Sequence, residues 1–393
     1  MTGTPIADSW LAENERELVA VRRRLHAHPE LGGQEYLTTA FLAERLSAAG
    51  LKPTVLSGGT GLVCDVVGGD GPVVVLRADL DALPIPDEKD VSYRSTVPGV
   101  CHACGHDVHT AVLLGAGLAL AQIRSQLAGT VRLVFQHAEE QMPGGALDVV
   151  REGWLDGAAA AFALHCDPAL EVGRVGLKSG PITAASDAIS VRLTGPGGHT
   201  SRPHKTVDLV QSLATVAAGL PAALARLVDP RAGLCLVWGH VSAGVASNAI
   251  PREGVVRGTM RMLDKDAWHD APDMVRRVVD DLVAPYGARA EVNYQRGVPP
   301  VVNDPSATAL MTAAVRSALG SGAAVPTLQS LGGEDFAWYL DEVPGALARL
   351  GVKSPGRSDP YDLHQGAFDV DESALPAGVR VLVATALAAL SAS

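Results

Sequence analysis

Short apolar runs alternate with helical patterns along the first half of the chain, and this alternation constrains the fold more than any other feature. Leu62–Val67, Val73–Arg77 and Thr130–Phe135 are rich in β-branched residues and predict strands. Thr110–Ala121 is apolar around its whole circumference and predicts a buried helix. A chain that alternates strands with helices builds a largely parallel sheet covered by helices. We therefore expect an α/β fold with a mixed, mostly parallel sheet and helices on both of its faces.

The pattern changes near residue 185 and resumes after residue 296. Between these points Ile189–Leu193 alternates like a strand with two different faces, and Val207–Val228 predicts a long helix. Two further strands, a helix and a last strand complete the order β-α-β-β-α-β, which suggests a small open sandwich. We expect one discontinuous larger domain, residues 1–184 and 296–393, interrupted by a smaller α+β domain, residues 185–295.

Composition excludes several classes of protein. The chain has 393 residues, 47% of them hydrophobic, so a disordered chain is excluded. Its net charge of −11 argues against nucleic acid or an anionic membrane surface as the main partner. We find no uncharged apolar run of the ~18 residues that a membrane span needs. Five cysteines, an odd number in a large chain, do not suggest a disulfide framework, so we expect a cytoplasmic protein.

Residues His102–His109 concentrate side chains that bind metals. This segment of eight residues holds three of the chain's twelve histidines, together with Cys104 and Asp107. Thiolate and imidazole are ligands suited to Zn²⁺, Co²⁺ or Ni²⁺, and a turn can aim Cys104 and His106 at one ion. Two other interpretations remain open: a buried cysteine among structural histidines, or a nucleophilic thiol whose pKa is lowered at a helix N-terminus.

Polar residues follow several of the predicted strands. Glu139 and Glu140 come after Thr130–Phe135, and Asp79 and His165 also lie just past predicted strands. Open α/β sheets place their active sites at these carboxyl ends. If a metal shares the site, one glutamate can bind it while the other acts as a general base. Each residue alone, and His364 late in the chain, is also compatible with an ordinary structural role.

The smaller predicted domain contributes candidate residues of its own. A glycine-rich stretch, residues 195–198, precedes His199, and glycine permits close approach to a ligand. It lacks the Lys-Ser/Thr ending of a phosphate loop, so a turn that presents His199 fits better. Arg261 has a planar guanidinium that can bind a carboxylate with two hydrogen bonds, and Asn248 precedes it in the same predicted domain. Both are also compatible with ordinary surface positions.

Seven sequence blocks carry a combined signal. In chain order they are residues 25–31, 77–85, 102–109, 138–140, 197–204, 332–336 and His364. Together they resemble one family, the amidohydrolase branch of the aminoacylase/carboxypeptidase-type metallopeptidases. This branch includes hippurate hydrolases, N-acyl-amino-acid amidohydrolases and the indole-acetyl-amino-acid hydrolases. The resemblance runs from about Leu18 to Leu390.

The resemblance implies a dinuclear metal site, with Zn, Mn, Ni or Co as candidate ions. Glu139 matches the catalytic base, His199 the lid histidine that steadies the reacting carbonyl, and Asp79 a carboxylate behind the metals. Asn248 and Arg261 stand where relatives hold the substrate carboxylate. The residues that match the family's metal ligands are Cys104, His106, Glu140, His165 and His364. The inserted domain would then be a lid, and relatives pair through it, so a homodimer is a further expectation.

The expected activity is hydrolysis of the amide of an N-acyl amino acid by a metal-activated water with Glu139 as base. A dipeptidase or carboxypeptidase would use the same site, a thiol amidase would use Cys104, and a binding module would have no turnover. Four positions depart from the family's usual residues: Cys101, His137, Gln141 and Cys166. They leave the acyl group, the amino acid and the native metal open.

Overall fold

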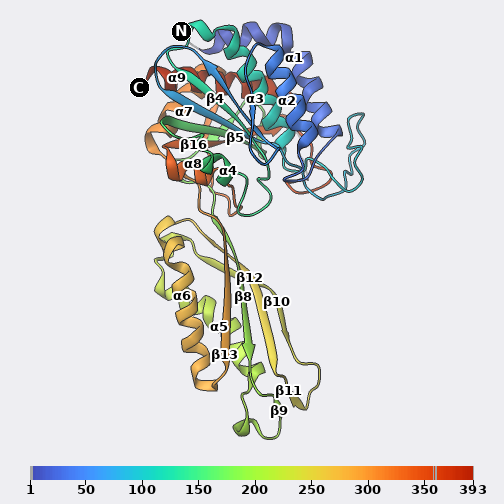
Figure 1. Cartoon of the computed structure of the whole chain (residues 1–393), viewed down its shortest axis with the longest axis vertical. Coiled ribbons are helices and arrows are strands. Elements are labelled where there is room, and N and C mark those ends of the chain that lie inside the picture. The colour runs from blue at the N-terminus through green and yellow to red at the C-terminus, as the bar shows by residue number, and fades with distance from the viewer. Residues whose placement is uncertain (1–2, 357, 359–360, 393) are drawn as a thin grey trace. The chain divides into compact units, whose positions relative to one another are not determined.

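The computed structural model describes residues 3–356, 358 and 361–392. The chain divides into two units (Figure 1). The first unit comprises residues 1–180, 302–328 and 335–393, and the second comprises residues 181–301 and 329–334. The chain therefore passes between the units four times.

A mixed sheet forms the centre of the first unit. Its strand order is β1-β2-β4-β3-β5-β16-β6-β15, and the central pairs β4–β3, β3–β5 and β5–β16 are parallel. The expected α/β class with a mostly parallel central sheet is confirmed. The strands are β1 (Thr54–Val55), β2 (Leu62–Val67), β3 (Val73–Asp79), β4 (Thr130–Gln136), β5 (Ala158–Glu171), β6 (Val175–Leu177), β15 (Ala324–Pro326) and β16 (Gly345–Lys353), and the short strands β7 (Gly180–Pro181) and β14 (Val302–Asn303) lie outside this sheet.

Helices cover the sheet of the first unit. Helices α1, α3 and α9 pack against one another, while α4 packs against α8 (Figure 1). Successive residues of β3 are buried from Val74 to Asp79, which is the pattern of a strand covered on both faces. The helices are α1 (Gly3–Ala27), α2 (Tyr36–Ala48), α3 (His106–Gln122), α4 (Ala146–Arg151), α7 (Pro305–Leu319), α8 (Ala337–Glu342) and α9 (Ala374–Ser391), with a 3-10 turn η1 (Arg124–Gln126).

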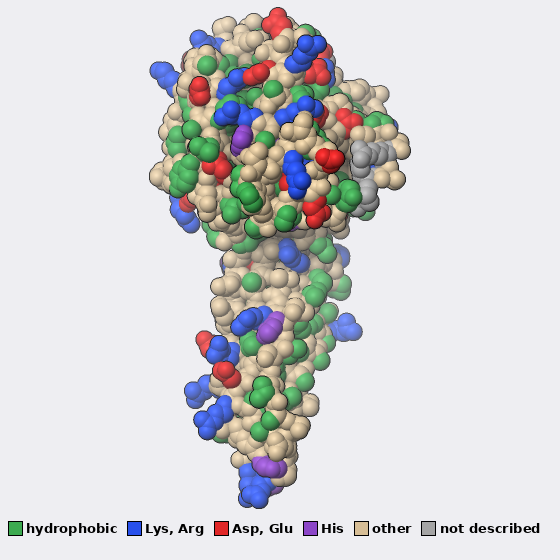
Figure 2. All heavy atoms as spheres, turned by 90° about the vertical axis from the view of Figure 1, so that its right-hand side faces the viewer, with side chains coloured by type: hydrophobic (Ala, Val, Ile, Leu, Met, Phe, Trp, Pro, Cys, Tyr) green, Lys and Arg blue, Asp and Glu red, His purple; other side chains and the backbone are tan. Residues whose placement is uncertain are grey.

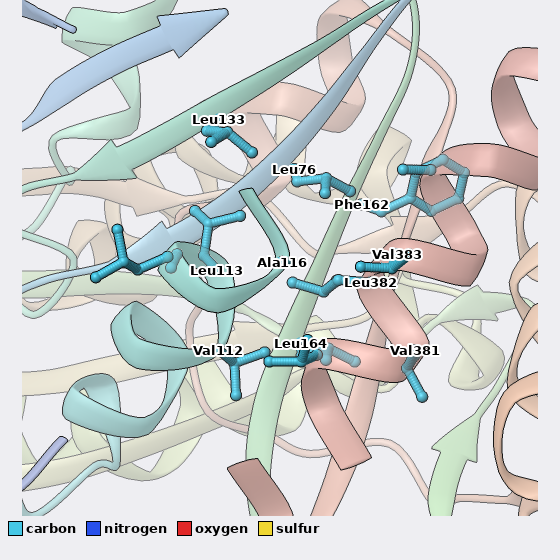
Figure 3. Packing of buried hydrophobic residues seen from close by; sticks show 14 of the residues in the cluster. Leu76, Val112, Leu113, Ala116, Leu133, Phe162, Leu164, Val381, Leu382 and Val383 are labelled. Atoms are coloured by element: carbon cyan, nitrogen blue, oxygen red, sulfur yellow. The ribbon is translucent and has the colours of Figure 1, made fainter. Parts of the chain in front are cut away.

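The main hydrophobic core lies between the sheet and the α3–α9 layer. Leu76 and Phe162 point from the strands toward Leu113 of α3 and Leu382 of α9 (Figure 3). These four side chains are at most 2% exposed. Burying one such side chain stabilises the fold by about 1.5–3 kcal/mol. This core holds rigid the strand ends on which the candidate site is built.

The second unit is an antiparallel sheet backed by two helices. Its strand order β10-β12-β8-β13 and chain order β-α-β-β-α-β match the expected small sandwich. The side chains of Asp208 and Asp264 accept hydrogen bonds from the first turns of α5 and α6, which fixes where these helices begin. The elements are β8 (Ala185–Thr194), β9 (Gly198–His199), η2 (Pro203–Lys205), α5 (Leu209–Leu227), η3 (Pro230–Ala232), β10 (Cys235–Ala243), β11 (Ala249–Ile250), β12 (Glu253–Met262), α6 (Lys265–Val283), η4 (Ala284–Tyr286) and β13 (Arg289–Val298).

Two helices correct the expectation that no apolar segment is long enough to span a membrane. Helices α5 and α9 both have sufficient length and apolar character. Most of α9 is buried inside the first unit, where it belongs to the main core. Helix α5 packs one face on β10, β12 and α6. Both helices therefore have a packing role within their units.

Candidate metal centre

The turn before α3 places two candidate ligands side by side. Gly105 lies between Cys104 and His106 and has φ +85°, a left-handed conformation that favours glycine. A Cβ on Gly105 would come within 2.8 Å of Sγ of Cys166. The tight turn therefore needs glycine, and it leaves Cys104 and His106 both buried at the start of the helix.

His106 has one ring nitrogen committed to a carboxylate and the other available. Its Nδ1 lies 3.2 Å from Oδ1 of Asp81, an acceptor, so Nδ1 carries the proton in this contact. Its Nε2 is buried and has no hydrogen-bond partner among the described residues. A buried nitrogen lone pair without a partner is costly unless a cation binds it.

His165 is arranged in the same way. Its Nδ1 donates to the carbonyl oxygen of Cys166 at 2.9 Å, which leaves Nε2 as a lone pair 3.6 Å from Sγ of Cys104. Burial holds the pKa of His165 well below its usual range, so the imidazole stays neutral, as a ligand must be. The ligand atoms of Cys104, His106 and His165 all lie within 4.8 Å of one another.

A second group of ligand atoms shares Cys104. It consists of Cys104, Glu140 and His364, again within 4.8 Å of one another. Nε2 of His364 lies 3.2 Å from Oε1 of Glu140, and that oxygen is buried without a hydrogen-bond partner in the described part of the chain. The backbone N–H of His364 donates to the carbonyl oxygen of Ala103 at 2.8 Å, which connects the loop of His364 to the turn that carries Cys104. Two groups that share one thiol suit two neighbouring cations.

Glu139 lies beside both groups. One of its oxygens is within 4.8 Å of ligand atoms of His106 and Glu140, and the residue is 5% exposed. The preceding residue, Ala138, has φ +52°, and its N–H donates to the buried carboxylate of Glu35 at 2.7 Å. A non-glycine residue in this region is strained, and the Glu35 contact holds the turn in place.

Asp79 and His109 support the ligands from behind. Oδ1 of Asp79 lies 2.6 Å from Nδ1 of His109, and Nε2 of His109 accepts the N–H of Cys166 at 2.8 Å. Both nitrogens of His109 are therefore engaged, so it is a poor candidate ligand. Although burial alone would raise the pKa of Asp79, its interactions with His106, His109 and Arg77 hold this pKa well below its usual range.

The second unit carries the remaining candidates. His199 on β9 pairs with Ala249 on β11, next to Asn248. Nδ1 of His199 accepts the N–H of Ser201 at 3.1 Å, so Nε2 is left to face a ligand. Arg261 lies far from this two-stranded sheet, near the opposite end of β12, and its Nη1 donates to the carbonyl oxygen of Leu331 at 3.3 Å. The seven residue-to-residue steps of extended chain from Gly254 to Arg261 span about 23 Å.

The comparisons with known proteins decide the family. A model described as Peptidase family M20/M25/M40 matches residues 75–388. The chain belongs to this family. The M20 relatives include an N-acetyl-L-cysteine deacetylase of Bacillus subtilis, 37% identical over 93% of this chain and 86% of that protein. Another is an N-acyl-L-amino acid amidohydrolase of Geobacillus stearothermophilus, 39% identical over 74% of this chain and 79% of that protein.

A solved structure and a longer relative add to this result. A Bacillus subtilis protein described as a dinuclear metal binding peptidase of the M20 family has a TM-score of 0.85 and 34% identity, covering 96% of this chain and 98% of that one. A Rhodococcus jostii protein that carries the name of a glutamate–cysteine ligase is 48% identical over 94% of this chain. This M20 chain spans 46% of the length of that relative. The expected family and hydrolase class are confirmed.

The structure also differs from the sequence expectations in two respects. His165 does not follow a strand but lies inside β5, because β5 stays paired with β16 through Glu171, beyond the point where β3 ends. His199 and Arg261 were expected at one substrate, but Arg261 lies near the end of β12, whereas His199 lies on β9, which pairs with β11 before the start of β12.

Three supporting residues were not predicted: Asp81, His109 and Glu35. Asp81 contacts Nδ1 of His106 and accepts the N–H of Glu140 at 2.9 Å. The signal for Asp81 was its place in the sequence block 77–85, two residues after Asp79, the last residue of β3. His109 belongs to the segment His102–His109, which the sequence analysis singled out for metal binding. Nothing near Glu35 in the sequence indicated that it supports the turn before Glu139.

The four unusual residues all have structural contacts. Gln141 donates to the carbonyl of Gly32 at 2.7 Å, and Nε2 of His137 lies 3.1 Å from Asp148. Cys101 exchanges backbone hydrogen bonds with Leu83, and the backbone of Cys166 contacts two imidazoles of the site. None of these contacts removes a candidate ligand.

Proposed function

We propose that this M20 chain hydrolyses the amide bond of N-acyl amino acids, with Glu139 as general base. The observation that carries the proposal is the position of the buried Glu139 carboxylate beside two ligand groups that share Cys104. Cys104, His106 and His165 would hold one divalent ion, and Cys104, Glu140 and His364 the other. The donor set and the buried Nε2 of His106, which has no hydrogen-bond partner among the described residues, fit cations of the Zn, Mn, Ni or Co type.

Each residue then has a distinct role. When bound, the two ions lower the pKa of a water and polarise the acyl carbonyl. Glu139 accepts the proton of the attacking water and returns it to the leaving amine. Nε2 of His199 donates to the oxygen on which negative charge develops. Asn248 and Arg261 hold the substrate carboxylate, which selects amino acids that are acylated on nitrogen.

Two rival activities use the same residues differently. A thiol amidase would need a lowered pKa at Cys104, whereas burial raises the pKa of this thiol in the metal-free protein. A dipeptidase or carboxypeptidase differs only in the acyl group that it accepts. The substrate panel below separates this second rival from an acyl-amino-acid hydrolase.

The test is a hydrolysis panel on the metal-loaded full chain. It contains acetyl, benzoyl, long-chain acyl and indole-acetyl conjugates of several amino acids, together with dipeptides of the same amino acids. We expect cleavage of acyl conjugates that is lost after chelation and restored by added Zn²⁺, Mn²⁺ or Co²⁺. Cleavage that continues in the presence of the chelator would contradict the proposal. Cleavage of the dipeptides without cleavage of any acyl conjugate would also contradict it.

N-acetylcysteine is the first substrate to test. One relative is named for its deacetylation, and the name of the longer Rhodococcus relative refers to a ligase that consumes cysteine. A hydrolase that releases cysteine would suit both names. Equal rates on N-acetylcysteine and N-acetylalanine would argue against a preference for cysteine.

The cysteines of the described chain are free thiols, which fits the cytoplasmic location that we propose.

We also propose a homodimer through strand β10 of the second unit. This edge strand exposes Val237 and Val241, which are 58% and 64% exposed. Figure 2 views the molecule from the side on which β10 lies in Figure 1, and hydrophobic side chains follow this part of the surface. An unpaired apolar edge is a template for another strand, and a second copy would cover it. Val241→Lys should shift the sedimentation of the protein to that of a monomer, while Asn293→Lys on the opposite edge strand, β13, should not.

A dimer would also explain the separation of His199 from Arg261. One N-acyl amino acid is too short to reach both ends of β12, so the second copy would supply His199 and Asn248 to a site. Mixing the inactive variants His199→Ala and Glu139→Gln under conditions that exchange subunits should restore part of the activity, because each hybrid has one intact site. No recovery despite exchange would contradict this arrangement.

A further inference from the structure

Arg77 is a buried guanidinium that joins three chain segments next to the metal centre. Its side chain is 1% exposed. Nη1 donates to Oδ2 of Asp79 at 2.7 Å, Nη2 to Oδ1 of Asp335 at 2.6 Å, and Nε to Oε1 of Gln136 at 3.1 Å. All three nitrogens of the fork therefore donate at hydrogen-bond distance, which only arginine can do from one position.

The first of these segments supports the histidines. With Oδ2 directed to Arg77, the carboxylate of Asp79 turns Oδ1 toward Nδ1 of His109. His109 in turn accepts the N–H of Cys166, whose carbonyl orients His165. The orientation of Asp79 is thus transmitted through two hydrogen bonds to the part of β5 that carries His165, a candidate ligand.

The same arrangement keeps Asp79 away from His106. Oδ2 of Asp79 lies 3.8 Å from Nε2 of His106, the nitrogen that faces the metal centre. Asp79, His106 and His109 also form a group whose ligand atoms lie within 4.8 Å of one another. A carboxylate is a competent ligand, so a small rotation of Asp79 would bring a hard oxygen to the group of Cys104, His106 and His165, whose ligand atoms are sulfur and imidazole nitrogen.

The second segment is the end of β4, which precedes the two glutamates. Gln136 accepts from Arg77 and donates through Nε2 to Oδ2 of Asp335 at 2.6 Å. Oδ2 of Asp335 also accepts the N–H of Ala146 at 3.0 Å, at the start of α4. These contacts fix both ends of the loop, residues 137–145, that carries Glu139 and Glu140.

We propose that Arg77 is a positioning residue for the metal centre: its fork holds Asp79 as a hydrogen-bonded support for His109, rather than as a metal ligand, and fixes the loop of Glu139 and Glu140. This inference rests on the proposed function only for the identity of the ligands. It makes Arg77 a determinant of how tightly, and with what geometry, the chain binds its ions.

The test measures binding of Co²⁺ alone to the chelator-treated full chain, without any acyl substrate. We compare the wild type with Arg77→Met, Arg77→Lys and Arg132→Met. Arg132 is a matched control because it also lies on a strand, β4, but outside the metal centre. Its Nε and Nη2 each donate to one carboxylate oxygen of Asp65 at 2.8 Å. Chelator competition gives the dissociation constants, and the thiolate-to-cobalt absorption band reports the geometry at Cys104.

Arg77→Met should bind Co²⁺ at least tenfold more weakly than the wild type, with an altered thiolate-to-cobalt band. Arg77→Lys, which keeps the charge but not the fork, should show a smaller loss, and Arg132→Met should bind like the wild type. A folded Arg77→Met with unchanged affinity and absorption would overturn the proposal, as would an equal loss in Arg132→Met. If Arg77→Met does not fold, an unchanged affinity in Arg77→Lys would overturn it. Because no substrate is used, failure here is distinct from failure of the proposed hydrolysis.

Discussion

The carbonyl oxygen of Cys166 accepts a hydrogen bond from Nδ1 of His165 at 2.9 Å, and the backbone N–H of Cys166 donates to Nε2 of His109 at 2.8 Å. One residue of β5 therefore sets the tautomers of two imidazoles. The first contact leaves Nε2 of His165 as a lone pair facing Cys104, and the second uses the only lone pair of His109. Backbone atoms thus distinguish a candidate ligand from a supporting histidine.

Removing the carboxylate of Glu139 separates catalysis from metal binding. Glu139→Gln keeps the size of the side chain but cannot accept a proton, so we expect kcat to fall about 10²–10⁴-fold, the usual contribution of general acid–base catalysis. Steady-state kinetics on the best substrate of the panel measures the loss. Elemental analysis should still find both ions, and wild-type activity in this variant would refute the assigned role.

Removing His364 should have the opposite signature. Its Nε2 is 3.2 Å from Oε1 of Glu140, in the ligand group that contains Cys104. We expect His364→Ala to bind one ion less tightly, so that metal content falls from two per chain toward one. His204→Ala, on the exposed turn η2 of the second unit, is the matched control and should keep two. Equal metal content in both variants would remove His364 from the ligand set.

Part of this candidate site could be predicted because four of its residues lie in two short, dense sequence blocks. Cys104 and His106 are separated by a single glycine, and Glu139 and Glu140 are adjacent, so local spacing already indicated a shared role. Strand alternation and the α/β pattern also predicted the central sheet. These are local signals, and they do not depend on how distant segments pack.

The residues that were missed act across long sequence distances. Glu35 supports the turn before Glu139 from 103 residues away, and His109 accepts the N–H of Cys166 from 57 residues away. No periodicity connects such pairs, because only the folded chain brings them together. The separation of His199 from Arg261 was hidden for the same reason: it follows from the pairing of His199 with Ala249, which is distant in the sequence and precedes β12.

A glycine two residues after His364 should be essential for the position of its loop. A Cβ on Gly366 would lie 2.2 Å from the carbonyl oxygen of Pro86, a backbone atom that cannot turn aside. Gly366→Ala should therefore displace the loop, weaken binding of one ion severalfold and lower stability by about 1–3 kcal/mol. Gly58→Ala, where a Cβ meets nothing within 4 Å, serves as the control in metal titrations and thermal melts. The prediction fails if the two variants behave alike.

Buried His102 should make the metal-free protein sensitive to mild acid. Burial lowers the pKa of His102 from 6.5 to about 4. The unfolded chain therefore takes up this proton near pH 6.5 but the folded chain only near pH 4, so the stability that His102 contributes is present above pH 6.5 and is lost as the pH falls through this window. Paired carboxylates add their losses mainly below about pH 4. In urea denaturation at constant excess chelator, His102→Gln should lose roughly 3 kcal/mol less than the wild type between pH 6.5 and 4, a difference set by the shift in pKa. Parallel curves for the two proteins would show that His102 does not titrate in this range.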